Sequence, residues 1–230
     1  MLSQFFQQDG EQVVISREQG SEFAKRVADD FNPLHDVDAK KFCVPGDLLF
    51  ALVLAKYGVS ENMHFTFAGM VDETSKLDFP AGSEAFDITS NDKVMLSVKR
   101  DGANNQCQTL IDSLTKNYVE FSGTTFPHVI IPLMAQKQVM INPARPMVIY
   151  ESMAIHLDKL DVTTLELEAS TPEFNYEGKR GKIILRFNLL SEGLKVGYGE
   201  KHMLVSGIRD YCQEMVDDLI EYYNDRKATL

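Results

Sequence analysis

Residues 23–58 read FAKRVADDFNPLHDVDAKKFCVPGDLLFALVLAKYG, and this stretch decides the fold. It begins inside a predicted helix over residues 17–29, which Ser16 can cap and in which apolar side chains recur at near-helical spacing. Pro33 stops that helix near Asp30, because the proline ring removes a backbone donor and disfavours helical backbone at the preceding residue. A short non-helical segment must therefore follow.

The second half of the stretch predicts a buried helix. Pro45-Gly46 opens the segment DLLFALVLAKY, and Gly58 supplies a stop signal. Because this helix is apolar almost all round, it belongs inside the protein, with other elements wrapped around it.

The rest of the chain predicts strands in two similar halves. In the first half we expect strands at residues 63–71, 85–88, 93–99 and 106–121, with a hairpin signal at Asp101-Gly102. In the second half an apolar helix over 127–141 precedes strands at 147–157, 164–168, 182–190 and 195–205, and an amphipathic helix over 208–226 follows. Each half has a buried helix and a run of antiparallel strands. This order predicts an α+β protein built from a duplicated unit, divided into residues 1–122 and 123–230.

Composition and charge narrow the class of protein. The formal net charge of the 230 residues is -11 and no basic stripe is present, so nucleic acid and anionic membranes are disfavoured as partners. The first residues lack a secretory signal pattern, and the longest apolar stretch is too short to span a bilayer. Three separated cysteines predict neither disulfides nor a zinc site. We expect a cytoplasmic protein without a metal or cofactor, and a homodimer is compatible with the sequence.

The segment between the two predicted helices carries the candidate chemistry. Asp30 lies at a helix end and His35 lies just past a proline turn, so their side chains can converge on one small volume. Histidine titrates near neutral pH and a neighbouring carboxylate stabilises its charged form, as proton transfer requires. The backbone N–H of Gly46 opens the buried helix and suits a developing negative charge. These residues predict an acid/base pair beside an oxyanion site.

The sequence D-F-N-P-L-H at residues 30–35 resembles the hydratase motif of MaoC-like (R)-specific enoyl-CoA hydratases. The resemblance implies a hotdog fold, in which an antiparallel sheet wraps around one apolar helix, and two such units imply a double hotdog. It implies that Asp30 and His35 activate water for addition to a 2-enoyl thioester of coenzyme A or a carrier protein. Asn32 would orient the loop, and the Gly46 amide would polarise the thioester carbonyl. The whole chain also resembles uncharacterised bacterial families of this length.

A non-catalytic acyl-binding or scaffold hotdog protein is one alternative. The segment between His35 and Gly46 is shorter than the insert usual in that family, and Pro45 stands where histidine is common. A serine often present in the central helix is also absent. These departures favour a fold that has lost the chemistry.

An acyl-CoA thioesterase is the other alternative. Hotdog thioesterases place a carboxylate near the start of the central helix, and Asp47 stands there, although it also complements the helix dipole. Lys40 and Lys41, beside the motif, are candidates to bind the phosphates of the ligand; otherwise they are solvated surface charges.

Overall fold

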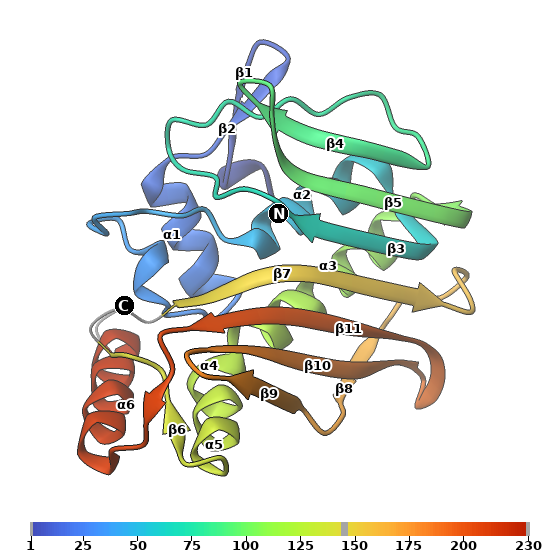
Figure 1. The fold of residues 1–230 in the computed structure, drawn as a ribbon. Coiled ribbons are helices and arrows are strands. Elements are labelled where there is room, and N and C mark those ends of the chain that lie inside the picture. The colour runs from blue at the N-terminus through green and yellow to red at the C-terminus, as the bar shows by residue number, and fades with distance from the viewer. Residues whose placement is uncertain (1, 144–146, 229–230) are drawn as a thin grey trace.

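The chain is organised around α2 (Gly46–Tyr57), the apolar helix that the sequence predicts (Figure 1). The computed structural model describes residues 2–143 and 147–228. Nearly every side chain of α2 is buried, and the Phe50 ring packs 5.2 Å from Phe65 and 4.8 Å from Tyr118. Gly58 ends the helix with a φ of 79°, a conformation that favours glycine. The predicted buried central helix is confirmed.

One antiparallel sheet wraps around α2 and a second helix, α3 (Gln108–Gly123), which lie behind the sheet in Figure 1. Its strand order is β4 (Ala85–Ser90), β5 (Lys93–Asn105), β3 (Val59–Phe67), β7 (Met147–Leu157), β11 (Leu194–Ser206), β10 (Arg180–Ser191) and β8 (Glu166–Ala169), and β9 (Glu173–Glu177) also pairs with β10. β3 and β7 join the two halves, and Phe65, Met153 and Phe187 share one core. The predicted α+β double hotdog is confirmed. Because the halves share a sheet and a core, the division after residue 122 stays a prediction.

The position of the second helix corrects two predictions. The sequence predicts a strand over residues 106–121, but most of this range is α3. Its β-branched residues, Ile111, Thr115 and Val119, favour a strand on propensity alone, yet they stand four residues apart on one buried helix face. The predicted helix over 127–141 is also wrong.

Residues 125–140 instead form two short helices and a short strand. These are α4 (Thr125–His128), α5 (Ile130–Ala135) and β6 (Val139–Met140). Pro127 and Pro132 each stand in the first turn of a helix, the only part of a helix that tolerates proline well. Each proline therefore prevents the preceding helix, α3 or α4, from continuing through it.

The predicted hairpin at Asp101-Gly102 is also wrong, because β5 runs straight through it. Gly102 has a φ of 78°, and the pairing of β3 with β5 shifts register at this point, opposite Glu61. A left-handed glycine serves a β-bulge as well as a turn. The signal marked a bulge within a long strand.

The remaining helices and strands surround the core. They are η1 (Leu2–Gln4), β1 (Gln7–Asp9), β2 (Gln12–Val14), α1 (Arg17–Arg26), η2 (Pro33–His35), β12 (Arg209–Asp210), which pairs with β6, and α6 (Gln213–Ala228). Ser16 caps α1 in a capping box with Gln19, as its sequence position predicts. α6 begins later than predicted. In the described part of the chain, no helix combines the length and apolar character needed to cross a membrane.

Candidate active site

The loop between α1 and α2 brings Asp30 and His35 together. Asp30 Oδ1 accepts the Asn32 N–H at 2.9 Å, and Asn32 Oδ1 accepts the Leu34 N–H at 3.1 Å and so caps η2. These two short-range hydrogen bonds fold the loop back on itself. Asp30 Oδ2 consequently lies 3.5 Å from His35 Nε2, and both side chains are largely shielded from solvent.

The other side of the His35 ring is held by the backbone. Its Nδ1 lies 2.6 Å from the Cys43 carbonyl oxygen, which can only accept a hydrogen bond, so Nδ1 carries a proton. In the neutral ring, Nε2 is then an acceptor that faces a carboxylate oxygen of Asp30, itself an acceptor. The two atoms lie 3.5 Å apart, too close for a water to lie between them, so a hydrogen bond across this gap needs a proton on one of the two. The two side chains therefore face each other across a gap that a single hydrogen bond can span.

The first turn of α2 lies close to this pair. The charges of Asp30 and His35 both act on the pKa of Asp47, which stands in that turn. Pro45, the residue before the helix, provides no side-chain hydrogen bond to the first N–H groups of α2, which include that of Gly46. The Leu48 N–H donates to the Pro45 carbonyl oxygen, and no side chain in the described part of the chain caps the N–H groups of Gly46 and Asp47, close to Asp30 and His35.

Gly46 allows neighbouring aromatic rings to approach the helix start closely. A Cβ added there would lie 3.0 Å from Phe67 and 3.1 Å from Tyr150. Lys40 and Lys41 are both exposed on the turn between His35 and α2. The loop thus gathers the predicted residues at one end of α2, with the two lysines on its solvent side.

A buried polar network begins at Asp47. Ser122, near the end of α3, donates a 2.5 Å hydrogen bond to Asp47 Oδ2, and Lys201 on β11 donates to the same Ser122 hydroxyl. All three residues are buried, and Asp47 Oδ1 has no hydrogen-bond partner among the residues that the structure describes. A buried carboxylate and a buried ammonium group are thus linked through one hydroxyl.

Burial shifts the ionisation of both charged members of this network. It raises the pKa of Asp47, and the Lys201 charge and the Ser122 hydrogen bond oppose the rise. It lowers the pKa of Lys201, and the charges of Asp47 and Asp30 oppose the fall. Each charge therefore offsets part of the cost of burying the other.

Two tyrosines close the network on the sheet side. The hydroxyls of Tyr118 on α3 and Tyr150 on β7 hydrogen-bond to each other, and Lys201 Nζ lies 4.1 Å from the centre of the Tyr150 ring. Burial raises the pKa of both tyrosines well above the usual value, and the Asp47 charge adds to the rise. Both phenols therefore stay neutral. The buried Lys201 ammonium group contacts the face of the Tyr150 ring and the Ser122 hydroxyl in place of solvent.

α6 covers the outer side of the Asp30 loop, at the same end of the molecule as α1 (Figure 1). The Tyr223 hydroxyl donates to the Asp29 carbonyl oxygen at 3.3 Å, and its ring lies 5.7 Å from Phe31. Lys227 forms an ion pair with Asp29, and Arg226 forms another with Asp36. Helix and loop are therefore held together by both charge and aromatic packing.

Ser122 and Lys201 are the site residues that sequence reasoning missed. Lys201 lies on a strand whose alternate residues, Gly199, Met203 and Val205, face the core. A lysine at an inward-facing position of such a strand was a signal that the sequence contained. Its partners could not be identified, because they lie far away along the chain.

Several solved structures resemble this fold at low identity. A TesB protein of Mycobacterium avium subspecies paratuberculosis is 10% identical, with a TM-score of 0.47, over 89% of this chain and 96% of that chain. A conserved protein of unknown function with a hotdog fold from Alicyclobacillus acidocaldarius is 10% identical, with a TM-score of 0.48, over 89% and 97%. An acyl-CoA thioesterase II, TesB2, from Mycobacterium marinum is 9% identical, with a TM-score of 0.40, over 73% and 90%. These similarities are too weak to transfer any activity to this chain.

A comparison with curated protein sequences gives no significant match. The family model of a protein of unknown function, DUF3581, matches residues 1–214. That match spans the whole sheet, α2, α3 and the Asp30 loop. The chain therefore belongs to the DUF3581 family.

Proposed function

We propose that this protein acts on acyl thioesters, and that Asp30 and His35 catalyse the reversible addition of water to a 2-enoyl thioester. The observation that carries this proposal is the 3.5 Å separation of Asp30 Oδ2 and His35 Nε2, beside the uncapped start of α2. The MaoC-like motif at residues 30–35 supports the same chemistry by resemblance. In this proposal the acyl group of the substrate is linked as a thioester to coenzyme A or to a carrier protein.

The reaction needs one proton removed and one returned. The Asp30–His35 pair takes a proton from water as the water oxygen bonds to the β carbon, and the double-bond electrons move toward the thioester carbonyl oxygen. The pair then returns a proton to the α carbon, which regenerates the thioester carbonyl. The first N–H groups of α2, which carry partial positive charge, stabilise the enolate between these steps.

The charge balance of the neighbourhood supports this role. Asp47 would oppose an enolate at the start of α2 if its charge were uncompensated. Lys201 supplies a cation to the same network through Ser122. Exposed Lys40 and Lys41 offer local positive charge to an anionic carrier, in a protein whose net charge of -11 otherwise repels one.

Hydration of a series of 2-enoyl-CoA thioesters, from crotonyl to decenoyl, tests the proposal. The rate at which the absorbance of the conjugated enoyl group falls should be proportional to the concentration of the protein. Asp30→Asn and His35→Ala should each reduce kcat/KM by about 10²- to 10⁴-fold. Asp38→Asn is a matched control, because Asp38 is exposed on the same loop. Equal activity in all three variants would refute the assignment.

Thioester hydrolysis is the second candidate, and the buried Asp47 network favours it. One Asp47 oxygen is held by Ser122 while the other is buried and has no partner among the described residues, so it could accept a hydrogen bond from a water that entered with the substrate. Hydrolysis predicts free thiol release that Asp47→Asn abolishes and His35→Ala leaves intact. Thiol detection in the same reactions separates the two chemistries.

If the protein catalyses neither hydration nor thioester hydrolysis, the remaining proposal is a non-catalytic acyl-binding module. Native mass spectrometry of the gently purified protein would then reveal a retained acyl ligand. Absence of turnover and of ligand, on coenzyme A and carrier-protein substrates alike, would end the acyl-thioester proposal.

A further inference from the structure

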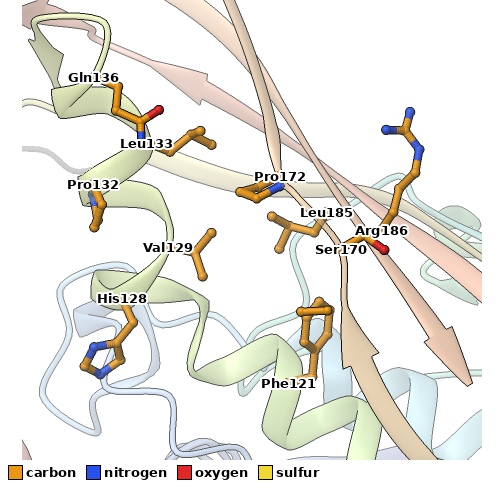
Figure 2. A pocket seen from close by; sticks show the side chains of 11 residues that line it. Phe121, His128, Val129, Pro132, Leu133, Gln136, Ser170, Pro172, Leu185 and Arg186 are labelled. Atoms are coloured by element: carbon orange, nitrogen blue, oxygen red, sulfur yellow. The ribbon is translucent and has the colours of Figure 1, made fainter. Parts of the chain in front are cut away.

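A cavity lies beside the end of α3, where Phe121 forms part of its wall. Its volume is about 290 Å³, and its lining includes Phe121, Val129, Leu133, Pro172 and Leu185 (Figure 2). In Figure 2 these apolar side chains surround a common space, whereas Arg186 points away from it. The cavity thus has a mainly apolar lining with four polar side chains, His128, Gln136, Ser170 and Arg186, a usual character for a small-molecule site.

The edge of the cavity offers no anchor for an anion. Arg186 pairs with Glu173 and with Glu200, the second pair at 3.4 Å, so two carboxylates surround its guanidinium group. A free carboxylate or phosphate would meet that negative charge. The cavity therefore suits an uncharged, aliphatic part of a ligand.

Phe121 lies between the cavity and the residues of the buried polar network. Its ring forms part of the cavity wall and lies 5.3 Å from the Phe187 ring and 6.5 Å from the Tyr118 ring. The next residue, Ser122, donates its hydroxyl hydrogen to Asp47. One aromatic side chain therefore stands between the apolar space and the buried polar network.

We propose that this cavity holds the aliphatic tail of the acyl group, a role that rests on the acyl-thioester function proposed above. An apolar cavity of about 150 Å³ binds benzene, so 290 Å³ accommodates roughly twice as many carbon atoms, about ten to twelve. Each methylene buried in such a space strengthens binding about fourfold. The tail that fits is of medium length.

Uncharged n-alkanols test this site without any need for turnover. Displacement of the fluorescent apolar probe N-phenyl-1-naphthylamine gives their affinities, from butanol to tetradecanol. We expect affinity to rise about fourfold per methylene and to level off near ten to twelve carbons. Failure of the full-length protein to bind any alkanol, or a rise that continues unchanged to the longest chain, overturns the proposal.

Filling the cavity provides the structural control. Val129→Phe should weaken decanol binding at least tenfold, because the larger ring occupies the space that the chain would fill. Val94→Phe makes the same change at an exposed position on β5 and should leave binding within twofold. Equal affinities in the two variants would overturn the site. If Val129→Phe does not fold, as judged by circular dichroism, Ser170→Phe at the exposed edge of the cavity replaces it, with the same expectation.

The outcomes distinguish this inference from the function on which it rests. Alkanol binding without enoyl hydration or thiol release supports the tail site and removes the proposed catalysis. Turnover with no alkanol binding removes the tail site and leaves the catalysis.

Discussion

Replacing Lys201 by methionine should destabilise the protein strongly, because it removes the one cation from the buried network. Methionine has a similar length and no charge, so packing against Tyr150 is largely kept. Asp47 would keep its hydrogen bond from Ser122 but lose the charge that offsets its burial. Breaking a buried charge pair by removing one partner costs about 3–5 kcal/mol. This loss is large beside a total stability of about 5–15 kcal/mol for an ordinary domain.

The second partner provides a control for this prediction. Asp47→Asn combined with Lys201→Met removes both charges, and such double replacements are far less costly than either single one. The double variant should therefore recover at least about 2 kcal/mol relative to the sum of the single variants. Gln in place of Lys201 should behave like Met, because it also lacks the charge.

The cost of Lys201→Met should depend on pH in a defined direction. Burial raises the pKa of Asp47, so the folded protein holds that proton more tightly than the unfolded chain does. Stability from this group is present at low pH and is lost as pH rises through the raised pKa. Without Lys201, the pKa of Asp47 in the folded protein is raised further, because the Lys201 charge no longer opposes the effect of burial. The stability that is lost as the pH rises is then larger. The destabilisation should be larger at pH 8 than at pH 4.5.

Urea unfolding followed by circular dichroism measures these free energies at both pH values. A destabilisation below about 1 kcal/mol at pH 8, or the same value at both pH values, would refute the account of the network. So would a double variant whose loss equals the sum of the single losses.

Three further changes test other parts of the structure. Gly123→Ala should lower stability by at least about 2 kcal/mol in urea unfolding, because its Cβ would lie 1.7 Å from the Ala28 carbonyl oxygen; a change near zero would contradict this close approach. Iodoacetamide at pH 8 should modify Cys107 before Cys43, as mass spectrometry of peptides would show. The reason is that exposed Cys107 has a pKa lowered by backbone N–H groups at the start of α3, whereas burial raises the pKa of Cys43 to about 11; the reverse order would refute this. Arg226→Ala should increase amide hydrogen exchange in the Asp30 loop and in α6 but not in β10, and unchanged exchange would mean that the helix does not hold the loop.

The sequence predicts the local parts of this molecule well. α2 and the end of α1 follow from short-range rules, namely an apolar run opened by Gly46 and a helix stopped before Pro33. The contact of Asp30 with His35 is also local, since two hydrogen bonds within the loop produce it. Patterns within a few residues were sufficient for these features.

The features that the sequence did not predict depend on contacts across the chain. The predicted strand over residues 106–121 is instead α3, in which Ile111, Thr115 and Val119 stand four residues apart on one buried face. Packing of that face against α2 and the sheet stabilises the helical conformation. Ser122 lies 75 residues from Asp47 and 79 from Lys201, so their hydrogen bonds exist only in the folded sheet. No local pattern could have revealed them together.

Hydrogen isotope incorporation from heavy water tests the central claim most directly. A saturated 3-hydroxyacyl-CoA or its 2-enoyl partner is incubated with the protein in deuterium oxide, and the deuterium content of the α carbon is measured by mass spectrometry. We predict incorporation at that carbon with the wild-type protein and, with Asp30→Asn or His35→Ala, incorporation slower by about 10²- to 10⁴-fold, because the pair returns the proton there. Deuterium incorporation at the wild-type rate in both variants, or free thiol formed with no incorporation at all, would contradict an Asp30–His35 hydration site.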